Sequence, residues 1–193
     1  MAIENVSKNT EYNVCVPAVR SKSKGRRIFW VVIVLRIVAL TATATATFVM
    51  ALNKQTKSFV VATVATTPIT ATLTAKFQDT PAFVLFVIAN AMGSFHNLLM
   101  IGVEVFGSKL DYKGLRAVTI SIFDMLTVAT ISGGVNAAVF MAELGKNGNS
   151  HANWNQICDK FGTYCDHGAA AIAASFVALL LMLIITIISI IHR

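Results

Sequence analysis

The chain has 193 residues, of which 55% are hydrophobic and only 13% are charged, and its formal net charge is +7. About a quarter of the residues of an ordinary soluble domain are charged, so this composition excludes that class and predicts an integral membrane protein. In a membrane protein, the distribution of Lys and Arg along the chain mainly reflects its topology. The positive charge therefore does not predict nucleic acid as a partner.

Residues 1–27 are polar and end in the basic run RSKSKGRR, so we expect a disordered cytosolic tail. The remainder, 28–193, is predicted to be one membrane domain with an all-α fold, because four spans leave no segment large enough for a separate soluble domain. Each span is long enough to cross a hydrocarbon core of about 30 Å. The four predicted spans are residues 28–52, 82–103, 117–142 and 168–191.

The first span contains an alternating Thr-Ala run over residues 41–47, which has the period of a β-strand. An isolated strand would leave its backbone groups without hydrogen bonds in lipid, whereas threonine hydroxyls can bond back to the carbonyls of a helix. We therefore predict a helix here.

The loop at 53–80 follows, with a threonine-rich and β-branched sequence. It predicts short extended strands that are broken near Pro68.

Orientation follows from counting Lys and Arg on each side of the four spans. Ten lie on the side of the N-terminal tail, the middle loop and the C-terminus, against five in the other two loops. The bias predicts that both termini are cytosolic and that the two remaining loops are extracellular.

Two spans carry charges of opposite sign. A carboxylate facing lipid costs about 3 kcal/mol on insertion scales, so Asp124 in the third span should face partner helices. Arg36 and Asp124 both lie about 12 Å from the cytosolic edge, and His96 with Asn97 lies at about 10 Å. We expect these four side chains to form one polar layer inside the bundle.

This layer has two interpretations. It is either a structural ion pair that fixes which helices are neighbours, or a part of a proton or ion pathway in a small transporter, channel or regulatory subunit. The first is favoured, because the outer half of the predicted bundle has almost no charge.

The second outer loop contains the one metal-like group of the sequence, namely His151, Cys158, Cys165 and His167. Two thiols and two imidazoles could bind zinc tetrahedrally. An extracellular loop is in an oxidising environment, however, so a disulfide between Cys158 and Cys165 is favoured and no metal or cofactor is expected.

Small residues recur at a spacing of four in three spans, which allows helices to approach closely. Packing within one bundle is favoured over self-association, and the sequence does not separate the two. The stripes are Ala89, Gly93 and Asn97; Gly133 with Ala137; Gly134 with Ala138; and Ala170, Ala174 and Ala178.

Catalytic motifs are missing. The sequence has no glycine-rich phosphate loop, no GxSxG and no HExxH, and only one histidine lies inside a predicted span. We therefore expect that the protein is not an enzyme.

Four segments carry a resemblance to a known family. They are VLRIVAL around Arg36, IFDMLTVA around Asp124, KFQDTPAFVLFVIANAMGSFHNLLM and AELGKNGNSHANWNQICDKFGTYCDH. With them, the chain from about residue 26 onward resembles the plant Casparian strip membrane protein-like family, which is related to the MARVEL-type four-helix proteins. Arg36 and Asp124 match the arginine and the aspartate that characterise the family.

The resemblance implies a plasma-membrane protein with cytosolic termini that forms homo-oligomers and hetero-oligomers with related four-span proteins. Founding members organise a membrane domain and recruit cell-wall-modifying enzymes. The first outer loop lacks the nine-residue signature of those founding members, so the chain resembles the broader group, whose roles vary. The resulting expectation is an oligomerising scaffold in the lipid bilayer.

Overall fold

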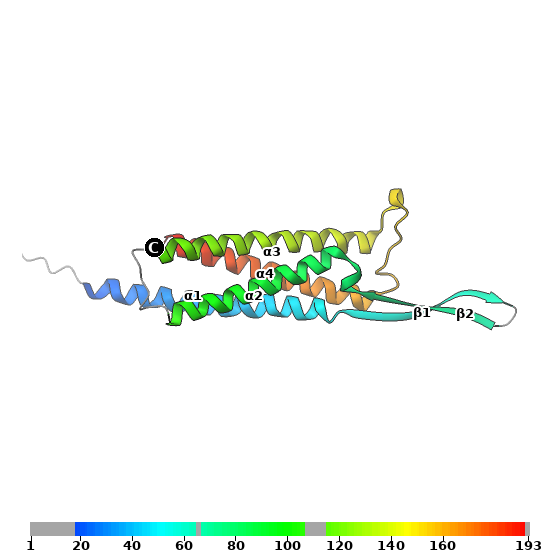
Figure 1. Cartoon of the computed structure of the whole chain (residues 1–193), viewed down its shortest axis with the longest axis horizontal. Coiled ribbons are helices and arrows are strands. Elements are labelled where there is room, and N and C mark those ends of the chain that lie inside the picture. The colour runs from blue at the N-terminus through cyan, green and yellow to red at the C-terminus, as the bar shows by residue number, and fades with distance from the viewer. Residues whose placement is uncertain (1–17, 65–66, 107–114, 192–193) are drawn as a thin grey trace, which may run out of the picture.

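The computed structural model describes residues 18–64, 67–106 and 115–191 and shows a bundle of four long helices with a β-hairpin at one end (Figure 1). The helices are α1 (Ala18–Ala51), α2 (Pro81–Phe106), α3 (Leu115–Asn147) and α4 (Gly162–Ile191). The hairpin consists of β1 (Lys54–Val64) and β2 (Thr67–Lys76), and two 3₁₀ turns complete the described elements, η1 (Phe77–Asp79) and η3 (Ser150–Ala152).

All four helices are long and apolar enough to cross a membrane. Their outward faces carry large apolar side chains: Phe95 of α2, Leu126 of α3 and Leu180 of α4 are each 57–62% exposed. Such a surface is unfavourable in water and suits a hydrocarbon solvent. The predicted four-span membrane fold is therefore confirmed.

The helices extend beyond the predicted spans. Helix α1 begins at Ala18, so the chain is helical over 18–27, where we expected a disordered tail, and residues 1–17 lie outside the described part. Helix α3 continues to Asn147 and α4 begins at Gly162. Lys, Arg and Glu are good helix formers, so a helix can continue past the apolar stretch that hydropathy detects.

The Thr-Ala run is helical, as predicted. Thr43 Oγ1 donates to the carbonyl oxygens of Ala39 and Leu40, each at 3.0 Å, and Thr47 Oγ1 donates to the carbonyl of Thr43 at 2.9 Å. Each hydroxyl thus finds its acceptor within its own helix, which removes the cost of placing it in lipid or in the core.

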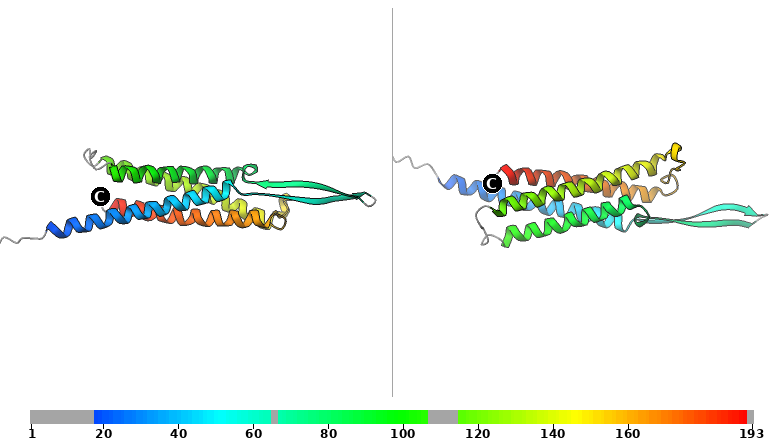
Figure 2. Two further views of the ribbon diagram at one scale, coloured as in Figure 1. Left: turned by 90° about the horizontal axis from the view of Figure 1, so that it is seen from below. Right: turned by 45° about the horizontal axis from the view of Figure 1, so that its top comes forward.

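The first loop forms two strands that are separated near Pro68, as predicted, but the strands are not short. Strands β1 and β2 have 11 and 10 residues and pair antiparallel, with one irregularity between Val60 and Ala62. Pro68 lies inside β2, opposite Thr63. Both strands of a two-stranded sheet are edge strands, so a residue without an N–H is tolerated there. The hairpin projects beyond the helices along the long axis of the bundle (Figure 2).

Helices α2 and α3 approach each other closely at Gly134. A Cβ at this position would lie 2.7 Å from Ala89 Cβ and 3.3 Å from Phe86 Cα. The neighbouring Gly133 is exposed on the outside of the bundle, and a Cβ there would have no atom within 4 Å. Of two adjacent glycines, one is therefore required for packing within the bundle and one is not.

This difference generates the first prediction. Gly134→Ala should lower the free energy of unfolding by about 1–3 kcal/mol, because neither Ala89 Cβ nor the α2 backbone can move aside cheaply. Gly133→Ala, the matched control, should leave stability unchanged or raise it by up to about 1 kcal/mol through helix propensity. Thermal unfolding in detergent micelles measures both, and equal effects of the two changes would contradict the packing described.

Candidate functional site

The centre of the site is an ion pair between α1 and α3. Arg36 and Asp124 are both fully buried. The guanidinium donates two hydrogen bonds to the carboxylate, from Nη1 to Oδ1 at 3.0 Å and from Nη2 to Oδ2 at 2.8 Å. This two-bond arrangement uses the planar geometry of both groups, so it fixes their relative orientation as well as their distance.

Two side chains of α2 complete the cluster. His96 Nε2 lies 2.7 Å from Asp124 Oδ1, and Glu104 Oε1 accepts a hydrogen bond from Arg36 Nε at 3.1 Å. A carboxylate can only accept, so Nε2 of His96 carries the hydrogen. Three helices therefore meet in one charged network, with Arg36 held between two carboxylates. This network consists of Arg36, His96, Glu104 and Asp124.

Glu104 was missed by the sequence analysis, which ended the second span at Val103 and placed this residue in a loop. Helix α2 continues to Phe106, so Glu104 lies on the same helical face as the two predicted polar residues. Its separation of eight residues from His96 and seven from Asn97 is the signal that could have identified it.

Asn97 is fully buried, as expected for a member of the polar layer, but it bonds within its own helix. Its Nδ2 donates to the carbonyl oxygen of Gly93 at 2.9 Å, and its Oδ1 has no hydrogen-bond partner among the described residues. No hydrogen bond in the described part of the chain connects Asn97 to the charged network.

Uncharged polar residues continue from this network toward the hairpin end of the bundle. Ser94 Oγ lies 2.8 Å from Thr43 Oγ1, which links α2 to α1. Ser175 Oγ donates to Asn90 Oδ1 at 2.7 Å, which links α4 to α2. Beyond Asn90 the core becomes apolar and is filled by fully buried side chains, namely Met50, Phe86 and Val135.

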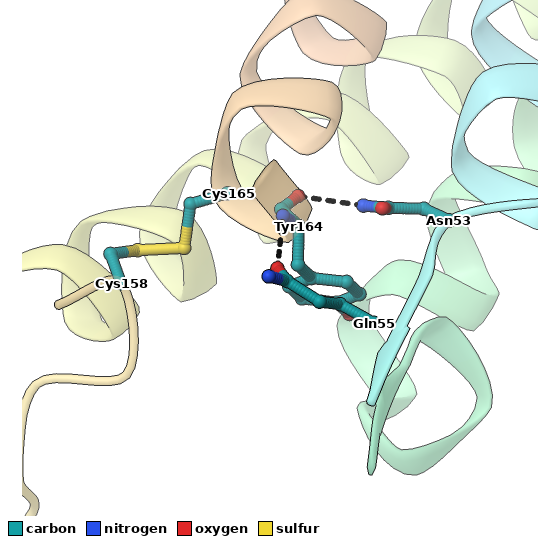
Figure 3. The surroundings of a disulfide bond; sticks show 5 residues. All are labelled: Asn53, Gln55, Cys158, Tyr164 and Cys165. Carbon is teal, nitrogen blue, oxygen red and sulfur yellow. Dashed lines mark hydrogen bonds between the residues drawn. A yellow bond between two sulfur atoms is a disulfide. The ribbon is translucent and has the colours of Figure 1, made fainter. Parts of the chain in front are cut away.

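A disulfide joins Cys158 to Cys165 at the hairpin end (Figure 3). The two sulfur atoms are bonded to each other, so neither cysteine can provide a thiolate to bind zinc. His151 and His167 are exposed, and the described residues contain no group of three or more metal-binding side chains. The bond ties the loop before α4 to the first turn of that helix.

Tyr164 connects this end of α4 to the hairpin. Its backbone N–H donates to Gln55 Oε1 at 2.8 Å, and its carbonyl accepts from Asn53 Nδ2 at 2.7 Å (Figure 3). The first contact satisfies an N–H in the first turn of α4, which has no partner within the helix. The rings of Phe59 and Phe161 also pack edge to face. The base of the hairpin is thereby held against the bundle.

Comparison with known proteins gives a consistent result. Residues 25–181 match the model of the Casparian strip membrane protein domain. A CASP-like protein 1B1 of Ricinus communis is 72% identical over 156 residues, which cover 81% of this chain and 77% of that protein. A CASP-like protein 1B2 of Arabidopsis thaliana is 64% identical over 156 residues, which cover 81% and 79%. No solved structure matches the chain significantly.

The charged network generates the second prediction. Asp124→Asn should lower the free energy of unfolding by about 3–5 kcal/mol, because it removes the charge that balances a fully buried guanidinium. Glu104→Gln is the matched control. It should have a smaller effect, because the Glu104 side chain is 11% exposed and Arg36 keeps its two bonds to Asp124.

Thermal unfolding of the purified protein, together with its abundance in membranes, measures both changes. If Asp124→Asn were as stable as the unmodified chain, the ion pair would not hold the bundle together.

Proposed function

The chain belongs to the Casparian strip membrane protein family, and from this premise we propose that it is an oligomerising, non-enzymatic scaffold of the plasma membrane. In this proposal, many copies assemble within the bilayer, with each other and with related four-span proteins. The assembly organises a membrane domain and recruits partners, which include cell-wall-modifying enzymes.

The observation that carries the proposal is the outward face of α3. Ala129, Gly133 and Asn136 are all exposed, and their spacing of four and three residues places them on one side of the helix. The stripes of small residues thus divide between two uses. Gly134 and Ala138 are buried inside the bundle, whereas Gly133 lies on the surface that would otherwise face lipid. Ala129, which was not part of the predicted stripes, is exposed on the same side.

Asn136 adds a polar group to this face. Its Nδ2 donates to the carbonyl oxygen of Ser132 at 2.9 Å, within the same helix. An exposed amide in a membrane-spanning segment is unfavourable against hydrocarbon and favourable against another helix, where it can hydrogen-bond. Together with a glycine that permits close approach, it forms a surface suited to a second membrane helix.

The charged network supports a structural role. Arg36 and Asp124 have no exposed surface, and the polar residues that lead away from them end at an apolar layer that includes Phe86 and Met50. A transporter or channel would need polar groups or an opening on both sides of its ionisable residues. The scaffold is therefore favoured over the alternative of a small transporter, channel or regulatory subunit.

Orientation completes the proposal. The bias of Lys and Arg favours an orientation with the termini and the middle loop in the cytosol. The β-hairpin and the disulfide-bonded loop, which lie together at the other end of the bundle, then face the cell wall (Figure 1). These two elements are the surfaces that extracellular partners would contact.

Gly133→Leu tests the assembly surface and is the third prediction. A leucine side chain on this face would hold a second helix away, so chemical crosslinking in membranes should recover at least about fivefold less dimer and higher oligomer, since 1 kcal/mol alone changes an equilibrium constant about fivefold. Gly102→Leu is the matched control. A Cβ on Gly102 also has no atom within 4 Å, but the residue lies on α2.

Unchanged crosslinking in Gly133→Leu, or an equal loss in Gly102→Leu, would remove α3 as the assembly surface.

The fourth prediction concerns assembly in cells. After photobleaching of a fluorescently tagged copy in the plasma membrane of plant cells, recovery should be slow and confined to patches, because a polymerised protein exchanges slowly. Gly133→Leu should recover faster. Fast and uniform recovery of the unmodified protein would contradict a scaffold, and an ion or solute flux that Asp124→Asn abolishes while assembly persists would favour the transport alternative.

A further inference from the structure

A cavity of about 1160 Å³ lies at the hairpin end of the bundle. In the view of Figure 1, helices α3 and α4 diverge toward this end. Residues of β2, of η1 and of the segment that carries the disulfide also line the cavity. The cavity is separate from the charged network, which lies in the other half of the bundle.

The walls of the cavity change in character with depth. The inner part is lined by apolar side chains of three helices, which are Phe83 of α2, Val139 and Ala142 of α3, and Ile172 and Phe176 of α4. The outer rim carries charged side chains of both signs, which are Lys76, Asp79, Glu143, Lys146 and Asp166. The site is thus amphipathic along the bundle axis.

The inner part lies within the depth of the membrane-spanning helices. Gly168 of α4 is next to Met50, one residue before the end of α1. Ile172 and Phe176 follow Gly168 by four and eight residues, so they lie about 6 and 12 Å deeper along the helix axis. The apolar walls are therefore at the level of lipid tails, and the charged rim is at the level of lipid head groups.

The cavity is accessible from the lipid side. Phe176 is 41% exposed, and Ala169 and Ala173, which also line the cavity, are exposed residues of α4. An acyl chain could enter between α3 and α4 without crossing the charged rim. Trp154 and Ile157 reach the cavity from the loop above and are half exposed there.

We infer that this cavity binds one zwitterionic phospholipid from the leaflet at the hairpin end. The apolar walls bind an acyl chain. Its methylene groups gain dispersion contacts where they pack closely against apolar side chains. Lys146 on the rim matches the phosphate, and Glu143 and Asp166 match the positively charged nitrogen of the head group. Rim charges of both signs fit such a head group better than a purely anionic one. The inference does not depend on the assembly proposed above.

A photoreactive lipid tests this site. The full chain is placed in bilayer nanodiscs of phosphatidylcholine that contain a phosphatidylcholine with a diazirine at the end of one acyl chain. After irradiation, adducts are mapped by mass spectrometry of peptides. We expect adducts to concentrate on α3 near residues 139–142 and on α4 near residues 172–176, several-fold above the outward faces of the same helices.

Two variants fill the cavity from opposite walls, namely Ala173→Trp on α4 and Ala142→Phe on α3. Each should reduce these adducts at least fivefold. Ala170→Trp is the matched control, because Ala170 is exposed on α4 but does not line the cavity, and it should leave the adducts unchanged. The disulfide and the thermal unfolding profile are measured in each variant to show that it is folded.

Three outcomes would overturn the inference. The first is an even distribution of adducts around the helices, which would indicate ordinary contact with bulk lipid. The second is an unchanged pattern in both folded filling variants. The third is loss of the adducts on addition of a sterol but not of unlabelled phosphatidylcholine, which would assign the cavity to a sterol.

Discussion

The buried contact between Arg36 and Asp124 is the interaction on which the bundle depends. In a hydrocarbon solvent, apolar side chains gain little by leaving lipid for the protein interior, so shape and polar contacts must select the arrangement of helices. The two-bond geometry fixes α1 against α3, and His96 and Glu104 add α2 to the same point. Uncharged contacts, such as the bond between Ser175 and Asn90, bring in α4.

Small residues then decide how closely the helices approach, both inside the bundle and beyond it. Successive residues of a helix point about 100° apart, so Gly133 and Gly134 face different surroundings although they are adjacent. Gly134 allows contact with Ala89, whereas a Cβ at Gly133 would have no atom within 4 Å. One helix can therefore serve internal packing and the proposed assembly with different residues of the same segment.

The hairpin end combines a rigid anchor with an open surface. The disulfide and the bonds of Tyr164 hold the loop, the hairpin base and α4 together. The hairpin projects beyond this anchor along the long axis of the bundle (Figure 1). The cavity to which we assign a phospholipid lies between α3 and α4 at the same end.

By itself, the sequence determined the class of the protein, its four spans and the pairing of residues at equal depth, because hydropathy and rise per residue are local properties of the chain. The tertiary structure decided what depends on the neighbours of each residue. It brought Glu104 to Arg36 and turned Asn97 toward its own helix. It also paired the two strands in one long hairpin and gave Gly133 and Gly134 different surroundings. Such choices follow from which surfaces meet in three dimensions, and no single segment carries that information.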